Sequence, residues 1–337
     1  MNYKKSLLRS AILPALFLAG SAAVSIIGCS TAPVKKDGNL NDTSASPQIY
    51  TFESDANGFN TKNFFYDNGQ EVVVFDTQFT AETAKKSLEF LRTKTQNPIT
   101  FVVVTHPNPD KFNGMSVFQE QGAKVVASRA TSDSMKGVHD YKKYYFVQIA
   151  KMFTEETYPK LSQVDVVFDQ SYEIKLRNGE TVELSELSSS GVSSNQTVAY
   201  LSGPNALFVG DLVHHNAHAW LEGGIVNAKP VPAIKGWIAG LNELSKRFGS
   251  KNPKVYGGRG EAAELNVAAS AQIAYLKKAD SIVTKYVSAL GAQKTELQTE
   301  KAGQHYLALQ SVFESAFPEY TLGYMIQYGV YGLANTK

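Results

Sequence analysis

The chain reads Thr105-His106-Pro107-Asn108-Pro109-Asp110-Lys111-Phe112-Asn113-Gly114 directly after the apolar run Phe101-Val102-Val103-Val104. A short apolar run that stops at a polar, proline-containing segment is typical of a buried strand opening into a loop. The loop carries His106 and Asp110, two residue types that bind metals or transfer protons. It also carries the cation Lys111. We therefore expect a functional site at the end of this strand.

Strands and helices alternate on both sides of this loop. A hairpin is expected where residues 63–66 and 71–75 flank the turn Asp67-Asn68-Gly69, since such residues favour a tight turn between two β-rich runs. Residues 80–94 place apolar side chains at helical spacing behind Thr80, a typical N-cap. Strands at 99–104 and 124–127 enclose a helix beginning at 115–121. The alternation predicts an α/β layered fold.

The second half of the chain predicts another sheet and a helical end. Strands of this second sheet are expected at 164–168, 172–176, 181–184, 197–201 and 206–209. Before them, the aromatic-rich residues at about 131–161 predict a helical insert beside the site. Amphipathic helices are expected at 268–290 and 301–317. The insert and these helices would shape a substrate mouth or a homo-oligomer interface, or simply pack on the sheet.

Three later segments carry further motifs, each at the end of an apolar strand. They are Gly191-Val192-Ser193-Ser194-Asn195-Gln196-Thr197-Val198-Ala199-Tyr200-Leu201, Leu207-Phe208-Val209-Gly210-Asp211-Leu212-Val213 and Val255-Tyr256-Gly257-Gly258-Arg259-Gly260. With the His106 loop they resemble, in order, the T-H-x-H-x-D-H-x-G-G, G-H-T, L-F-x-G-D and V-x-P-G-H-G motifs of the metallo-β-lactamase superfamily. The resemblance covers about residues 60–262. It implies a four-layer αββα sandwich, here with a helical insert and a C-terminal helical extension.

The resemblance also implies a two-zinc site whose ligand set is altered here. His106, Asp110 and Asp211 remain, whereas Asn108, Lys111, Val192 and Arg259 stand where further ligands are expected. Valine has no donor atom, and lysine or arginine would set a cation against a cation in a partly buried site. A conventional two-zinc centre is therefore not expected.

The replacements predict how the remaining charges are balanced. Asp110 and Asp211 are costly to bury close together unless cations neutralise them. We expect Lys111 and Arg259 to pair with them and to replace the second metal electrostatically. In the alternative, both cations point to solvent. The same two side chains are candidate substrate-binding residues for an anionic group.

Histidines after Asp211 keep a metal-dependent alternative open. The chain has six histidines, and His214, His215 and His218 closely follow Asp211. A relocated site for one Zn, Fe or Mn ion would use His106, Asp110, Asp211 and His214 or His215. The resemblance also implies a pocket-lining role for a histidine after the aspartate, which makes His218 a candidate substrate contact. A metal-free acid–base pair of His106 and Asp110 is a third possibility.

The amino terminus has the features of an export signal. Lys4, Lys5 and Arg9 precede an apolar stretch over residues 11–27. Ile26-Ile27-Gly28-Cys29 resembles a bacterial lipobox, which implies a lipid on Cys29, and Ser30 then implies an outer-membrane lipoprotein facing the periplasm. The alternative is an ordinary cleaved signal with an incidental cysteine. We expect a signal peptide at 1–29, a flexible tether at 30–47, a metallo-β-lactamase-like domain at 48–262 and the extension at 263–337.

Composition narrows the function classes. Cys29 is the only cysteine, so this exported chain is expected to have no intramolecular disulfide and no thiolate metal ligand. A net charge of +2 gives no broad basic field, so nucleic-acid binding is not expected. Two main functions remain. One is a binding or accessory lipoprotein for an unknown small molecule. The other is a hydrolase of esters, lactones or amides in which one relocated metal activates water, Asp110 orients it, and Arg259 or Lys111 holds an anionic group.

Overall fold

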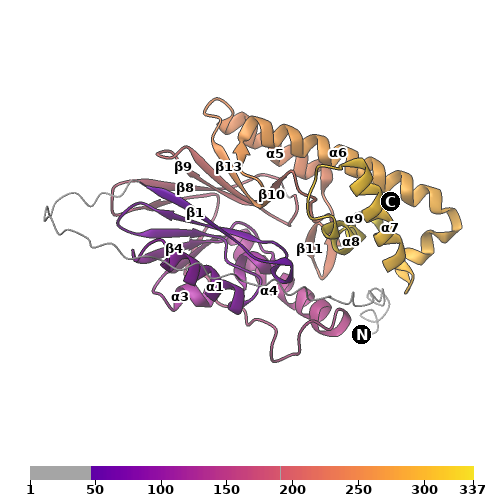
Figure 1. The fold of residues 1–337 in the computed structure, drawn as a ribbon, viewed down its shortest axis with the longest axis horizontal. Coiled ribbons are helices and arrows are strands. Elements are labelled where there is room, and N and C mark those ends of the chain that lie inside the picture. Colours follow the sequence, from indigo (N-terminus) through magenta and orange to yellow (C-terminus); the bar gives the residue numbers. More distant parts are fainter. Residues whose placement is uncertain (1–46, 190) are drawn as a thin grey trace, which may run out of the picture.

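Two six-stranded sheets face each other, and helices cover both outer faces (Figure 1). The computed structural model describes residues 47–189 and 191–337. The expected export signal, Cys29 and residues 30–46 of the expected tether therefore lie outside the described residues. The order helix, sheet, sheet, helix confirms the α/β, four-layer αββα sandwich expected from the sequence.

The first sheet is built around the strand that ends at the His106 loop. Its strands, in spatial order, are β1 (Gln48–Glu53), β2 (Lys62–Asp67), β3 (Val72–Phe75), β4 (Ile99–Val103), β5 (Lys124–Ser128) and β6 (Val166–Phe168). The expected hairpin joins β2 to β3, and β3 to β6 run parallel. Parallel strands end at the same edge of a sheet, so the loops after β3 and β4 lie side by side there.

The strand expected at 164–168 in the second sheet belongs instead to the first sheet. β6 runs parallel to β5, with Val126 opposite Val166. The Asp165 carboxylate accepts a hydrogen bond from the Val125 amide at 2.8 Å, and the Asp165 amide donates to the Val125 carbonyl at 2.9 Å. These bonds hold the segment at the edge of β5. An apolar run alone does not reveal which sheet edge accepts it.

The second sheet carries the other candidate residues. Its strands, in spatial order, are β14 (Ala263–Glu264), β13 (Lys254–Gly260), β10 (Ala206–His215), β9 (Thr197–Leu201), β8 (Thr181–Glu186) and β7 (Ser171–Lys175). β10 continues beyond the expected end at residue 209, so Asp211 lies within a strand. β10 and β13 are parallel neighbours, which places His214 opposite Arg259.

Helices complete the outer layers and the C-terminal end. They are α1 (Ala81–Arg92), α2 (Pro109–Phe112), α3 (Met115–Gln119) and α4 (Arg129–Tyr144) by the first sheet, α5 (Ile234–Phe248) and α6 (Leu265–Leu290) by the second, and α7 (Ala302–Ala316), α8 (Tyr324–Gly329) and α9 (Tyr331–Ala334) at the end of the chain. Thr80 caps α1 as expected, accepting from the Thr83 amide. Of the expected insert, α4 and a π-helical turn (Tyr145–Ile149) are helical, and residues 150–161 are not. Two further elements were not expected from the sequence: α5, and the short hairpin of β11 (Gly224–Val226) and β12 (Lys229–Val231).

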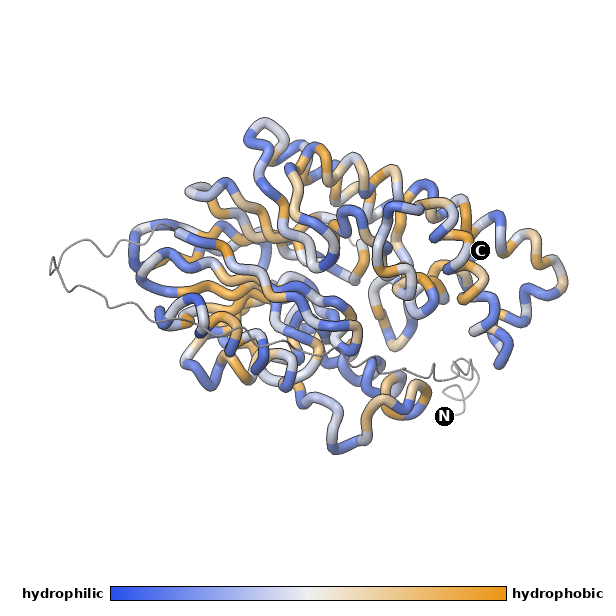
Figure 2. Tube along the Cα trace, viewed as in Figure 1, coloured by the Kyte–Doolittle hydropathy of each residue, from blue (hydrophilic) through white to orange (hydrophobic). Residues whose placement is uncertain are grey.

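Apolar side chains form three layers between these elements. One layer lies between the sheets and includes the stacked rings of Phe75 and Phe208. A second lies under α1 and α3, and a third joins the second sheet to α5, α6 and α7. In Figure 2 the hydrophobic colour follows the strands inside the molecule. Within residues 47–189 and 191–337, no helix combines the length and the hydropathy needed to cross a bilayer.

Candidate functional site

The candidate residues meet where strands of both sheets end. β4 leads into the loop that holds His106 and, within α2, Asp110 and Lys111. From the second sheet, β10 brings Asp211 and β13 brings Arg259. Because β10 and β13 are parallel neighbours, the two side chains reach the same end of the sandwich.

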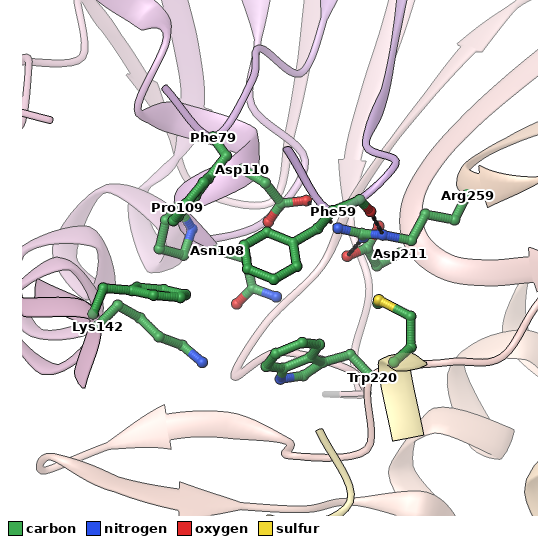
Figure 3. Close-up of a pocket in the computed structure, with 11 residues that line it drawn as sticks. Phe59, Phe79, Asn108, Pro109, Asp110, Lys142, Asp211, Trp220 and Arg259 are labelled. Carbon is green, nitrogen blue, oxygen red and sulfur yellow. Dashed lines mark hydrogen bonds and ion pairs between the residues drawn. The ribbon is translucent and has the colours of Figure 1, made fainter. Parts of the chain in front are cut away.

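Four charged side chains form a closed cluster at this end, which we call the ion cluster: Asp110, Lys111, Asp211 and Arg259. The Lys111 ammonium lies 2.8 Å from Asp110 Oδ2 and 2.7 Å from Asp211 Oδ1. Arg259 Nη1 donates to Asp211 Oδ2 at 2.7 Å, and Nη2 donates to Asp110 Oδ2 at 3.0 Å. In Figure 3 the guanidinium of Arg259 extends toward the two carboxylates. Each cation therefore bridges both carboxylates, which confirms the expected ion pairs.

Two further groups fix the Arg259 side chain. Its Nε donates to the Phe59 carbonyl at 2.8 Å, and its Nη2 also donates to Thr61 Oγ1 at 3.0 Å. The Thr61 hydroxyl lies 3.1 Å from Asp110 Oδ2. Phe59 and Thr61 belong to the segment before β2, and no sequence motif points to them. Their approach to Arg259 depends on how the two sheets pack.

The ion cluster is shielded from water. The Lys111 side chain is 0% exposed and that of Arg259 is 4% exposed. Burial alone would raise the pKa of Asp211, but the Arg259 guanidinium and the Lys111 ammonium hold that pKa well below its ordinary value. Burial alone would lower the pKa of Lys111, and the two carboxylates raise it instead. All four groups are therefore charged at neutral pH, and their charges cancel.

Glycines give the cluster its space. A Cβ at Gly258 would lie 2.1 Å from Asp211 Oδ1 and 2.7 Å from Lys111 Nζ. At Gly210, where φ is +50°, a Cβ would lie 2.2 Å from Thr105 Oγ1. Any larger residue at these positions would displace the groups that the cluster needs. Gly258 thus allows the charged side chains to pack closely, and Gly210 leaves room for Thr105 and His106 beside them.

Asp76 holds the start of the His106 loop through hydrogen bonds to Thr105, and no role was expected for it from the sequence. It follows β3, adopts a positive φ of 59°, and its Oδ1 accepts hydrogen bonds from the Thr105 amide and hydroxyl, both at 2.9 Å. The Thr105 hydroxyl in turn lies 3.0 Å from His106 Nδ1. Burial raises the pKa of Asp76 to about 6, against the opposing charge of Lys111. This chain of contacts sets the orientation of the His106 ring.

The predicted histidines divide into those at the cluster and those away from it. His106 Nε2 lies 3.7 Å from Asp211 Oδ2, and His214 Nε2 lies 3.9 Å from Asp211 Oδ1. Both nitrogens are buried and have no hydrogen-bond partner among the described residues. Burial lowers the pKa of His214 to about 3, so its ring is neutral. His215 ends β10 opposite Gly260 and, in the described part of the chain, makes no ion pair or hydrogen bond with either carboxylate.

His218 lies apart from the ion cluster, among the C-terminal helices. Its ring packs against Tyr275, Phe313, Phe317 and Tyr320, and its Nδ1 lies 3.2 Å from the Tyr275 hydroxyl. It does not line the pocket beside the cluster. The structure thus does not bring this predicted substrate contact to the site, because the chain turns away after β10 toward α6 and α7.

A small pocket opens beside the ion cluster. Its volume is about 40 Å³, and its wall includes Asn108, Asp110, Asp211 and Arg259. Phe59, Phe79, Lys142, Phe146, Trp220 and Met325 complete this wall with Pro109. In Figure 3 Lys142 enters from α4, on the side opposite to Arg259. Lys142 is itself paired with the buried Glu222, to which Trp220 Nε1 also donates at 2.7 Å. The helical insert therefore forms part of the pocket wall.

The residues at this site do not fit a two-zinc centre. Asn108 and Val192 supply no imidazole, and Val192 is buried in the apolar layer beneath the second sheet. Both oxygens of Asp211 face cations of the protein at 2.7 Å. Across the described ranges, no group of three or more His, Cys, Asp or Glu side chains is arranged to hold a metal ion.

Comparisons with known proteins agree with this architecture. A sequence model described as the Metallo-beta-lactamase superfamily matches residues 56–259, a range that contains every member of the ion cluster. Among solved structures, the chain is similar to a metallo-beta-lactamase from Pontibacter korlensis, with a TM-score of 0.52 and 20% sequence identity over 70% of this chain and 97% of that chain. At this identity the likeness supports the fold alone. Curated proteins give no match.

Proposed function

The chain belongs to the metallo-β-lactamase superfamily, and from this premise we propose that it is a lipid-anchored member with a degenerate metal site. In this proposal Lys111 and Arg259 supply the positive charge that metals supply elsewhere in the superfamily. The protein then acts as a binding or accessory lipoprotein and not as a conventional two-zinc hydrolase. The ion cluster is the single observation that carries the proposal.

Support comes first from the place of the Lys111 ammonium. It lies within 2.8 Å of both Asp110 and Asp211, and its side chain is fully buried. A divalent ion close to this ammonium would meet strong repulsion in a site with little water. Without a cation, the two buried carboxylates would repel each other. Lys111 therefore removes the electrostatic need for a metal between them.

Support comes second from the completeness of the Arg259 contacts. The guanidinium reaches both carboxylates, the Thr61 hydroxyl and the Phe59 carbonyl. Buried charges are retained when their hydrogen bonds are satisfied. The side chain thus stabilises the folded chain without an added ligand. A small molecule would meet the cluster only through the adjoining pocket.

Metal content tests the proposal directly. We expect the full-length chain, purified in detergent without chelators, to hold far less than one metal ion per chain. A variant that restores the superfamily ligands, Asn108→His, Lys111→His, Val192→His and Arg259→His, should gain metal and serves as the positive control. Stoichiometric metal in the unaltered chain would contradict the proposal.

The lipid anchor needs its own test, because Cys29 lies outside the described residues. We expect palmitate label to enter the wild-type chain and not Cys29→Ser. The labelled chain should sediment with outer membranes. Label in both chains, or in neither, would contradict anchoring through Cys29.

One observation favours the alternative hydrolase. His106 Nε2 and His214 Nε2 are buried within 4 Å of Asp211 and have no hydrogen-bond partner among the described residues. Bound in a relocated site, one metal ion would supply an activated water for an ester, lactone or amide. The same metal measurement separates the two candidates. Metal that is present in the unaltered chain and lost in both His106→Ala and His214→Ala would establish the alternative.

A further inference from the structure

A second cavity lies where the helical insert, the β11–β12 hairpin and the C-terminal helices meet. Its volume is about 310 Å³, and its wall shares no residue with the pocket beside the ion cluster. The wall takes Tyr141 and Tyr145 from the insert, Lys229 from the hairpin, and Tyr306 and Tyr331 from α7 and α9. We call this cavity the tyrosine pocket. Its volume lies at the lower end of the range of small-molecule sites.

Aromatic surface dominates the inner part of the tyrosine pocket. The Tyr141 and Tyr306 side chains are buried, and those of Tyr145 and Tyr331 are partly buried. Ile149 and Leu297 add aliphatic surface beside them. Aromatic rings make favourable stacked or edge-on contacts with other rings. A planar aromatic body fits this wall better than an extended aliphatic chain.

The tyrosine hydroxyls are unequally satisfied. Tyr306 donates to the Leu297 carbonyl at 3.1 Å and accepts from Asn335 Nδ2 at 3.2 Å. The hydroxyls of Tyr141 and Tyr331 lie 3.1 Å apart, so their shared bond uses only one of their two protons. No hydrogen bond from the Tyr145 hydroxyl to any described residue is found. Burial raises the pKa of Tyr141 and Tyr145, so both keep their protons. Two phenolic donors therefore remain for a ligand oxygen.

The charge of the lining is positive. Lys229 is the one fully charged residue among the described residues that line the tyrosine pocket. The carboxylate of Glu222 lies behind Tyr141 and Tyr145, but the Lys142 ammonium pairs with it and Trp220 donates to it. Among the described residues, no Asp or Glu side chain lines the tyrosine pocket, so a ligand at the mouth meets a cation there.

The hairpin turn forms part of the mouth of the tyrosine pocket. Val226 pairs with Lys229 across this two-residue turn, which places Asn227 at φ +50° and Ala228 at φ +56°. Positive φ at both central residues is the ordinary geometry of a tight hairpin turn. Ala228 lines the tyrosine pocket directly. The turn holds the adjacent Lys229 at the rim.

We propose that the tyrosine pocket binds a small planar aromatic molecule that carries one anionic group. The ring lies among the four tyrosines, and the anion receives hydrogen bonds from the phenols and the charge of Lys229. This site goes beyond the binding function proposed for the ion cluster and does not depend on it.

Three naphthalene compounds of similar shape and different charge test the ligand class. The full-length chain in lipid nanodiscs would be titrated calorimetrically with 2-naphthoate, neutral 2-naphthalenemethanol and cationic 2-naphthylmethylammonium, with empty nanodiscs as the blank. We expect 2-naphthoate to bind most tightly. Equal or tighter binding of the neutral or cationic probe would overturn the anionic class, and no binding of any probe would overturn the site.

Variants locate the binding. Thr336→Trp places a large ring in the wall near the exposed C-terminus and should abolish 2-naphthoate binding. Lys229→Met should weaken it about threefold, as expected for an exposed charge. The matched control Lys235→Met removes an exposed lysine outside the wall and should leave the affinity unchanged. Binding that survives Thr336→Trp would place the ligand elsewhere.

A last variant tests the phenol. Tyr145→Phe keeps the ring and removes one donor, which should weaken 2-naphthoate about fivefold and the neutral probe less. Unchanged 2-naphthoate affinity in both Tyr145→Phe and Lys229→Met would overturn the proposed recognition of the anion.

Discussion

The charged side chain of Lys111 is buried out of contact with solvent. Its ammonium lies 2.7 Å from one carboxylate and 2.8 Å from another, and the side chain is 0% exposed. A buried charge without its partner is far more costly than the same pair is stabilising. The stability of the folded chain thus depends on keeping this cluster neutral. That dependence makes the cluster testable by substitution.

Replacing Lys111 with an uncharged residue should therefore destabilise the folded chain strongly. We expect Lys111→Met to lower the free energy of unfolding by about 3–5 kcal/mol, because it leaves two buried carboxylates with one cation. Denaturant unfolding followed by circular dichroism would measure the loss. The control is Lys86→Met, which breaks an exposed pair with Glu82 and should cost at most about 0.5 kcal/mol.

The charge-balanced variant separates electrostatics from packing. Asp110→Asn combined with Lys111→Met removes one charge of each sign from the cluster. We expect the double variant to be more stable than Lys111→Met alone. Equal losses in Lys111→Met and Lys86→Met would show that Lys111 does not compensate buried charge.

At the scale of elements, one substitution within α4 should stabilise the folded chain. Gly137 lies inside this helix on an exposed face, and a Cβ there would meet nothing within 4 Å. Glycine costs a helix interior roughly 0.5–1 kcal/mol relative to alanine. We expect Gly137→Ala to raise the free energy of unfolding by about that amount.

A glycine with the opposite environment provides the contrast. At Gly258 a Cβ would strike Asp211 Oδ1 at 2.1 Å, so Gly258→Ala should destabilise the chain in the same unfolding measurement. An unchanged or raised free energy of unfolding in Gly258→Ala would contradict the packing of β13 against the ion cluster, and a lowered one in Gly137→Ala would contradict the open environment of Gly137.

At the scale of the whole molecule, the C-terminal helices are part of the main body. Leu309 and Phe313 of α7 share one apolar layer with Trp237 and Leu241 of α5. This layer spans the domain boundary expected at 262/263. A chain that ends at residue 300 should therefore lose its cooperative unfolding transition or become insoluble. Calorimetry of that chain, beside one that ends at residue 334, would measure the difference.

The shorter deletion is the matched control, since it removes only the last residues of the chain. An unchanged melting temperature in the chain that ends at residue 300 would mean that α7 to α9 form an independent attachment. The homo-oligomer interface expected at the C-terminal helices stays a prediction, and Leu307 and Val312 of α7 are exposed on these helices. Light scattering of the wild-type chain would test it.

The pH dependence of global stability belongs to the same scale. Burial among aromatic rings lowers the pKa of His218 to about 4, although Glu314 opposes this shift. In the unfolded chain the histidine binds a proton below about pH 6.5. Between these two pH values the ring binds more protons in the unfolded state, so the contribution of His218 to stability falls as the pH falls from 6.5 toward 4.

Removing the titrating ring should flatten this dependence. We expect His218→Phe to lose less stability than the wild-type chain over that pH range, as measured by denaturant midpoints. The contribution of His214 and the opposite contribution of Asp76 would remain in both chains. Tyr320→Phe alters the same aromatic cluster but keeps the histidine, so it should preserve the wild-type slope. A full wild-type slope in His218→Phe would contradict burial of the neutral ring.

Local signals were sufficient for the alternation of strands and helices. Apolar runs, the Thr80 cap and the Asp67-Asn68-Gly69 turn act over a few residues, so the sequence alone determined most strands and helices. The four-layer sandwich and the altered ligand positions were predicted through the resemblance to the superfamily motifs. Given those positions, Lys111 and Arg259 were expected beside Asp110 and Asp211 because two buried like charges require opposite charges. The helical periodicity of α5, at Trp237, Leu241, Leu244 and Phe248, is present in the sequence and was missed.

Only the tertiary structure decided which distant residues meet. Arg259 and Asp110 are 149 residues apart in the chain, and Arg259 and Thr61 are 198 apart. Their contacts depend on the packing of two sheets, as does the edge of β5 that accepts β6. The removal of His218 from the site and the tyrosine pocket arise in the same way. Such contacts follow from how whole elements pack in three dimensions, and no local pattern in the chain records that packing.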